Sequence, residues 1–122
     1  MRTLFALVFG VAAWAQQHEM TTYHLVLLQK GPSWSRDVTS EVQNIQEGHM
    51  AHIRRMAETG KLVVAGPIGA EHNLRGIFIF ASSSIEEVKE WCARDPAVKA
   101  GRLTVEVYPW HAAKGLKVDP PK

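Results

Sequence analysis

Residues 47–67, EGHMAHIRRMAETGKLVVAGP, contain the second half of a predicted helix, a turn and a complete strand. The helix is expected to end at Gly60, because glycine adopts the left-handed conformation that terminates helices without a steric penalty. The next segment, KLVVAGP (61–67), has adjacent valines and is closed by Gly66 and Pro67, which is typical of a short strand. A helix that leads directly into a strand indicates an α+β fold.

Upstream of Gly60, the helix is predicted to begin at Ser40, because Ser40 and Gln43 have the spacing of a capping box. Its apolar residues recur at steps of three and four and form one stripe along the helix. The stripe consists of Val42, Ile45, His49, His52, Ile53 and Met56. Both histidines are therefore expected to face the interior of the domain.

Three further segments have the pattern of strands. TTYHLVLLQK (21–30) and GIFIFA (76–81) are apolar on both faces under the two-residue period of a strand. RLTVEVYPW (102–110) is predicted to be the last strand. Together with KLVVAGP they supply four strands.

Two more helices are predicted between the third and fourth strands. Ser84 and Glu87 form a second capping-box pattern ahead of a helix that would bury Ile85, Val88 and Trp91. Asp95 followed by Pro96 is typical of a helix cap with proline at the first helical position, so a short helical turn is expected there.

The order strand, helix, strand, strand, helix, strand is the βαββαβ arrangement of the ferredoxin-like fold. We expect a four-stranded antiparallel sheet with its two main helices on one face. The strands are apolar on both faces, yet the helices can cover only one of them. An apolar sheet face without helices needs another layer, so we expect a homodimer in which the two sheets pack face to face.

The chain begins with MRTLFALVFGVAAWAQQ (1–17), which has one arginine, an apolar run, and small residues at Ala13 and Ala15. This pattern predicts a signal peptide over residues 1–15 and a periplasmic or secreted protein, without membrane attachment after cleavage. The apolar run is shorter than the roughly 20 residues of a membrane span. The last segment, 112–122, is rich in proline and is expected to be a flexible tail.

Composition excludes some functions and limits others. The chain has 14 basic and 12 acidic residues that are interspersed along the sequence, which argues against nucleic-acid binding. Cys92 is the only cysteine, so no internal disulfide can form. We expect Cys92 to be a small buried residue and the fold to be stabilised by packing.

Four pieces of the sequence together indicate a protein family. Each piece alone is common in proteins, but their order and spacing are more specific. The pieces are HMAHIRRMAETGKLVVAGP (49–67), LRG (74–76), DP (95–96) and VYPW (107–110). Together they resemble the YciI-like (YCII-related) family over residues 22–111. The resemblance implies a dimeric α/β-barrel of ferredoxin-like subunits with a cleft in each subunit. It also implies an active site of one histidine and one aspartate, which match His49 and Asp95.

A histidine–aspartate pair suits acid–base chemistry. A carboxylate bonded to one ring nitrogen fixes the tautomer and makes the other nitrogen a better base. Such a pair would suit isomerisation, lactone chemistry or elimination, and the resemblance extends to members linked with dechlorination of hydroxylated aromatics. The chain departs from the family at Gln46, where relatives often have an arginine one turn before His49.

Further candidates for lining the cleft are His24, His52, Gly66, Pro67 and Trp110. His49 and His52 are three residues apart on one helix, a spacing that could place two ligands on a metal. A metal site needs three or four ligands, and no motif in the sequence supplies the others. We therefore expect neither a metal nor another cofactor.

Other interpretations remain open at this point. Asp95 could serve only as a helix cap, and His49 could be a core histidine bonded to a backbone carbonyl. The cleft could then hold a small ligand without reacting with it, in a binding or sensing dimer. A third hypothesis, a small oxygenase or haem-handling protein, rests on fold analogy alone.

Overall fold

The computed structural model of the chain describes residues 19–82 and 84–115. The predicted signal peptide (1–15) and the last part of the predicted tail (116–122) lie outside the described residues. Within the described part of the chain, no helix is long and apolar enough to cross a membrane.

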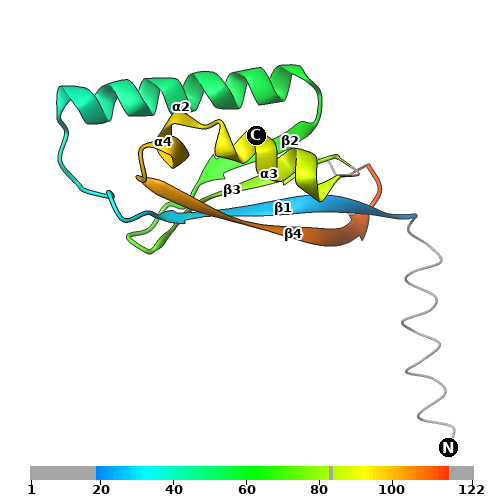
Figure 1. The fold of residues 1–122 in the computed structure, drawn as a ribbon. Helices are drawn as coiled ribbons and strands as arrows, with labels where there is room; N and C mark the ends of the chain where they lie inside the picture. Colours follow the sequence, from blue (N-terminus) through cyan, green and yellow to red (C-terminus); the bar gives the residue numbers. More distant parts are fainter. Residues whose placement is uncertain (1–18, 83, 116–122) are drawn as a thin grey trace, which may run out of the picture. The chain divides into compact units, whose positions relative to one another are not determined.

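The strands form one four-stranded antiparallel sheet in the order β2-β3-β1-β4 (Figure 1). Their bounds are β1 Met20–Lys30, β2 Leu62–Pro67, β3 Leu74–Phe80 and β4 Leu103–Ala113. The central pair, β1 and β3, is aligned with Leu25 opposite Ile79 and Leu27 opposite Ile77. This order and the antiparallel pairing confirm the predicted ferredoxin-like fold.

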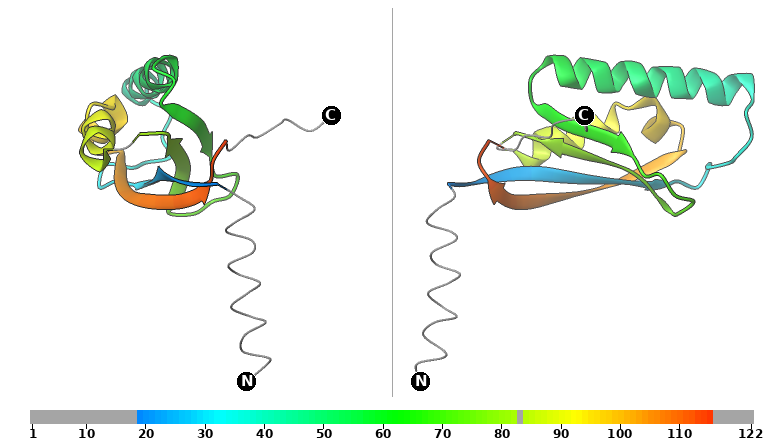
Figure 2. Two further views of the ribbon diagram at one scale, coloured as in Figure 1. Left: turned by 90° about the vertical axis from the view of Figure 1, so that its right-hand side faces the viewer. Right: turned by 180° about the vertical axis from the view of Figure 1, so that it is seen from behind.

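The helices are α2 (Ser40–Glu58), α3 (Ile85–Ala93) and the short α4 (Pro96–Lys99). All three lie on the same face of the sheet, as Figures 1 and 2 show. The core between helices and sheet is made of buried side chains from both layers: Val26, Leu28, Met56, Leu62, Phe78, Phe80, Val88, Cys92, Ala97 and Leu103. The predicted assignment of the helices to one face is therefore confirmed.

The opposite face of the two central strands is also apolar. Leu25, Leu27, Ile77 and Ile79 alternate with the core residues along β1 and β3, so they point away from the helices. Each of the four is half-buried, whereas their core-facing neighbours are buried. No helix among the described residues covers this face.

The described chain divides into two units, residues 23–110 and a smaller unit that includes residues 19–22 and 111–115. Within the smaller unit, the amide of Lys114 donates to the carbonyl of Glu19 at 2.6 Å. This pairing extends β4 to Ala113, so the first two residues of the predicted tail belong to a strand.

The start of α2 differs from the prediction by one residue. Thr39, not Ser40, is the N-cap: its backbone is extended, and its hydroxyl oxygen accepts a hydrogen bond from the Val42 amide at 3.1 Å. The predicted capping box of Ser40 and Gln43 is therefore wrong, because Ser40 is already the first helical residue. The predicted end is confirmed, since Gly60 follows the helix with φ of +77°.

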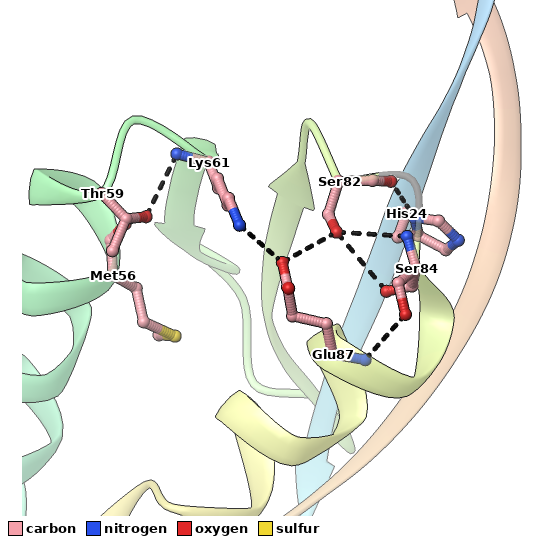
Figure 3. Close-up of polar contacts among 7 residues, drawn as sticks. All are labelled: His24, Met56, Thr59, Lys61, Ser82, Ser84 and Glu87. Atoms are coloured by element: carbon pink, nitrogen blue, oxygen red, sulfur yellow. Dashed lines mark hydrogen bonds and ion pairs between the residues drawn. The ribbon is translucent and has the colours of Figure 1, made fainter.

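Ser84 is the N-cap of α3, as predicted, and belongs to a larger polar network (Figure 3). The reciprocal half of the predicted capping box is wrong, because the Ser84 amide donates to the Ser82 hydroxyl at 3.2 Å. The Ser84 hydroxyl accepts from the Glu87 amide at 3.2 Å. The Glu87 carboxylate in turn accepts from Lys61 Nζ at 2.8 Å and from the Ser82 hydroxyl at 3.2 Å. The hydrogen bond from Lys61 lowers the pKa of the Glu87 carboxyl. The network joins the start of β2 to the first turn of α3.

The position of the α2 cap can be tested with two alanine substitutions. Thr39→Ala should lower the free energy of unfolding by about 1 kcal/mol, because the Val42 amide loses its acceptor. Ser40→Ala is the matched control and should change it by less than about 0.5 kcal/mol, since alanine is a better helix former than serine. Urea denaturation followed by circular dichroism measures both, and a larger loss for Ser40→Ala would contradict the assignment.

Candidate functional site

A cavity of about 330 Å³ lies in the unit of residues 23–110. This volume is within the range of small-molecule sites, roughly 300–1,000 Å³. The lining comes from α2, α4, the four strands and the loop after β1, and it is mostly apolar. Its polar and aromatic side chains are Trp34, Gln46, His49, Arg75, Phe78 and Arg102.

His49 and Asp95 meet beside this cavity. His49 Nδ1 lies 2.6 Å from Asp95 Oδ2, and the two side chains are 12% and 1% exposed. A carboxylate accepts the hydrogen bond, so Nδ1 carries the proton and Nε2 carries the lone pair of the neutral ring. No described residue forms a hydrogen bond with Nε2. The arrangement leaves one nitrogen of a cavity-lining histidine available as a base.

Asp95 both caps a helix, as one interpretation of the sequence predicted, and bonds His49. Its Oδ1 accepts from the Ala97 amide at 2.8 Å and caps α4, while Oδ2 bonds His49. The two oxygens thus serve different helices. The cap fixes the direction of the carboxylate, and the carboxylate fixes the orientation of the imidazole.

Gly48 allows α2 and α4 to lie close enough for this bond. A Cβ at Gly48 would lie 3.0 Å from Pro96 Cγ, which is tighter than an ordinary contact. Gly48 precedes His49 and Pro96 follows Asp95, so the close approach of the two helices brings the imidazole and the carboxylate together.

The loop after β1 carries Trp34 to the cavity. The Gly31 amide donates to the carbonyl of Arg102, and the Ser33 amide donates to the carbonyl of Gly101, both at 2.8 Å. A Cβ at Gly31 would lie only 2.2 Å from the Gly101 carbonyl oxygen, so no other residue fits there. These contacts hold the loop against the turn before β4.

Two arginines contact the Trp34 ring. The guanidinium carbon of Arg102 lies 4.9 Å from the ring centroid and that of Arg75 lies 5.1 Å from it, both within the range of cation–π contacts. Lys30 Nζ lies 5.7 Å from the same centroid. Both arginines line the cavity, and the lining contains no carboxylate side chain. The cavity therefore has a positively charged region as well as a histidine bonded to a buried carboxylate.

The other two predicted site histidines lie away from the cavity lining. His52, 6% exposed, donates from Nε2 to the carbonyl of Trp91 at 2.8 Å. His24, 4% exposed, donates from Nδ1 to the carbonyl of Ser82 at 2.6 Å, as Figure 3 shows. Each ring bonds a backbone carbonyl of a distant segment, and the structure does not bring either together with Asp95.

Of the remaining predicted site residues, two line the cavity and one does not. Gly66 and Pro67, at the end of β2, line the cavity. Trp110 does not; its ring contacts that of Tyr23 with centroids 6.0 Å apart. A ligand-binding role for these residues stays a prediction.

No group of three or more His, Cys, Asp or Glu side chains within residues 19–82 and 84–115 is arranged to hold a metal ion. Cys92 is 1% exposed and belongs to the core. Burial, together with the nearby Asp95 charge, raises the pKa of the Cys92 thiol to about 12. The thiol is therefore protonated at neutral pH and unsuited to act as a nucleophile.

The sequence interpretation did not identify Arg75 and Arg102 as cavity residues. Arg75 lies at the start of β3 and Arg102 directly precedes β4. In an antiparallel sheet of this order, β3 and β4 run in the same direction, so their first residues lie at the same edge. One arginine at the start of β3 and another directly before β4 were therefore the sequence signal for the positively charged region of the cavity.

Comparison with known proteins supports the fold and identifies the family. No curated protein matches the sequence significantly. A similar solved structure is 5-chloro-2-hydroxyhydroquinone dehydrochlorinase from Burkholderia phenoliruptrix AC1100, in complex with 2,5-dihydroxybenzoquinone. It is 24% identical, with a TM-score of 0.53, over 72% of this chain and 92% of that chain. The model of the YCII-related domain matches residues 22–111, which confirms the resemblance found in the sequence. The chain belongs to the YCII-related family.

Proposed function

We propose that the chain is a cofactor-independent enzyme in which His49 is the general acid and base and Asp95 is its positioning residue. The observation that carries this proposal is the 2.6 Å hydrogen bond between His49 Nδ1 and Asp95 Oδ2 at the wall of a cavity. A histidine oriented by a buried carboxylate is a common arrangement for proton transfer, because the carboxylate also stabilises the imidazolium that forms.

The proposed reaction begins at a carbon next to a carbonyl group of a small organic substrate. His49 Nε2 takes the proton, and the electrons of the C–H bond form a C=C bond while the carbonyl oxygen becomes an enolate. Where the enolate is conjugated with a further C=C bond, the imidazolium can return the proton at the far carbon of the dienolate, which gives isomerisation. Alternatively, the enolate re-forms the carbonyl and expels a leaving group such as chloride, which gives elimination. Both outcomes balance without an oxidant or a reductant.

The similar solved structure suggests one substrate class to test. That protein is a dehydrochlorinase, and its structure contains a dihydroxybenzoquinone. Loss of HCl from a chlorinated hydroxyaromatic needs a base near a C–H or O–H bond and a leaving group that departs as chloride. The proposed roles of His49 and Asp95 are suited to this chemistry, and equally to lactone or keto–enol chemistry.

His49→Gln should reduce turnover by about 10²–10⁴-fold, because the general base is lost. Asp95→Asn should reduce it by about 10–100-fold, since Asn retains the α4 cap but not the charge that orients the imidazole. The measurement is deuterium incorporation from D₂O into lactones, ketones and chlorinated hydroxyaromatics, followed by NMR, together with chloride release.

His52→Gln is the matched control. His52 is on the same helix, one turn beyond His49, but bonds the Trp91 carbonyl, and a glutamine amide can replace that donor. Its turnover per folded molecule should stay within about threefold of the wild type, since general-base loss costs far more. Equal exchange by wild type and His49→Gln would remove His49 from the mechanism. Saturable binding without exchange would favour the alternative, a ligand-binding module.

We also propose that the chain is a homodimer. The support is the apolar sheet face of Leu25, Leu27, Ile77 and Ile79, which no described helix covers. A second copy presents the same apolar surface, and packing two such faces completes the layer that each sheet lacks.

Light scattering coupled to size exclusion should therefore give twice the chain mass. Leu27→Asp should shift the protein to the monomer, because it places a charge at the centre of the interface. Val38→Asp is the control: Val38 is 77% exposed in a loop, so this variant should remain dimeric. A wild-type monomer at micromolar concentration would overturn the proposal.

We propose, finally, that residues 1–15 are a signal peptide and that the mature protein is periplasmic or secreted. Expression of the full chain in a bacterial host, followed by N-terminal sequencing of the exported fraction, should give Gln16 as the first residue. Ala15→Leu should block cleavage, because the processing site requires a small residue there, whereas Ala12→Leu should be processed normally. Recovery of intact chain beginning at Met1 in the cytosol would contradict export.

A further inference from the structure

Two buried N–H groups at the cavity have no acceptor in the described part of the chain. Trp34 Nε1 and Arg75 Nε are both buried, and neither has a hydrogen-bond partner among the described residues. Buried donors in folded proteins are nearly always paired, so each unpaired donor requires an explanation. Both side chains line the same cavity, and the Arg75 guanidinium lies over the Trp34 ring at 5.1 Å. The two donors therefore belong to a single contact pair at the cavity wall.

The charge around this pair is unbalanced. Arg75 Nη1 donates to the carbonyls of Ala70 and His72 at 3.1 and 3.3 Å, and Arg102 Nη2 donates to the carbonyl of Ser35 at 3.4 Å. These partners are neutral carbonyls, so two positive charges at the cavity lack a directly bonded carboxylate in the described part of the chain.

Glu71, an acidic group that interacts with Arg75, is already paired with other cations. Glu71 accepts from Lys30 Nζ at 3.1 Å and lies 3.1 Å from Arg36 Nη2. The hydrogen bond from Lys30 and the charge of Arg36 lower the pKa of the Glu71 carboxyl, with a smaller contribution from Arg75. Glu71 is 60% exposed and is not part of the cavity lining. It therefore leaves the positive charge at the cavity largely uncompensated.

The wall beside the catalytic pair is aromatic. The His49 and Phe78 rings are stacked, with centroids 6.4 Å apart and planes 25° apart, and both line the cavity with Leu28 and Ile53. A mostly apolar cavity with aromatic walls and a few polar groups favours a small planar ligand whose orientation is fixed by its polar end.

We propose that the cavity binds planar organic anions through an oxyanion subsite formed by Trp34, Arg75 and Arg102. A carboxylate or phenolate oxygen of the ligand accepts from Trp34 Nε1–H and Arg75 Nε–H, and Arg102 supplies the second positive charge. Both N–H groups are covered in this structure, so binding through them requires the two side chains to rotate as the oxygen enters. Oxyanions bonded by guanidinium groups form strong, charge-assisted hydrogen bonds.

The subsite also bears on the chemistry, and in this respect it rests on the proposed function. Removal of a proton by His49 Nε2 creates negative charge on the substrate. Fixed donors and guanidinium charges in a site shielded from water stabilise such charge without reorganisation. The substrates selected by the subsite are therefore acids whose reaction passes through a further anionic state, such as an enolate.

Benzoate and benzamide form a matched pair of probes, because they have the same ring and nearly the same shape but differ in charge. Calorimetric titration of the wild-type protein should show benzoate binding at least tenfold more tightly than benzamide. Arg102→Gln and Arg75→Gln should each weaken benzoate binding at least fivefold and leave benzamide binding unchanged. Trp34→Phe keeps the ring but removes the N–H, and should weaken benzoate binding severalfold.

Arg36→Gln is the control for general electrostatic attraction. Arg36 belongs to the same group of charges, but its side chain is 76% exposed and does not line the cavity, so benzoate affinity should be unchanged. Equal affinity for the two probes would overturn the subsite, as would equal losses in Arg36→Gln and Arg102→Gln. If either arginine variant loses its native circular dichroism spectrum, Trp34→Phe decides the question, and unchanged benzoate affinity in that variant would reject the assigned donor.

The binding test is independent of catalysis. His49→Gln should retain the preference for benzoate, since His49 is not one of the proposed oxyanion donors. A protein that prefers benzoate but shows no His49-dependent proton exchange would refute the proposed function and keep the subsite. A protein that shows such exchange but no preference for benzoate would support the proposed function and refute the subsite.

Discussion

The buried carboxylate of Asp95 is the interaction on which both the fold around the cavity and its chemistry depend. At 1% exposure it has almost no contact with water, and a carboxylate is stable there only when its oxygens are bonded. One oxygen takes the Ala97 amide and the other takes His49 Nδ1. The carboxylate that caps the first turn of α4 is thus the same group that orients the imidazole on α2. A single side chain couples the position of one helix to the tautomer of a residue on another.

The two chemical regions of the cavity have separate structural origins. The histidine–aspartate pair comes from the helical layer, where the contact between Gly48 and Pro96 sets the spacing of α2 and α4. The arginines come from the sheet, where the starts of β3 and β4 lie at the same edge as the end of β1. The apolar core between the layers separates these groups from water on one side. The cavity therefore combines the histidine–aspartate pair with a cationic region, and neither layer supplies both.

Local signals in the sequence were sufficient to predict the order of the elements and the end of α2 at Gly60. The pairing of His49 with Asp95 was predicted through the family resemblance. Local signals were insufficient wherever a partner lies far along the chain. Spacing showed that His52 faces inward, but its acceptor is a carbonyl 39 residues away. The extension of β4 to Ala113 is accompanied by a backbone bond from Lys114 to Glu19, the residue before β1. At Thr39 and Ser40, two adjacent hydroxyl residues could each cap α2, and only the backbone conformation decides between them.

Gly48 places helix stability and site geometry in opposition. A glycine inside a helix costs roughly 0.5–1 kcal/mol relative to alanine, so helix propensity alone favours Gly48→Ala. The added methyl would require Pro96 to move by a few tenths of an ångström, between the residues that carry the imidazole and the carboxylate. The net effect of Gly48→Ala on stability is therefore set by how readily Pro96 yields. Gly48 sets the helix propensity of α2 against the close approach that brings His49 and Asp95 together.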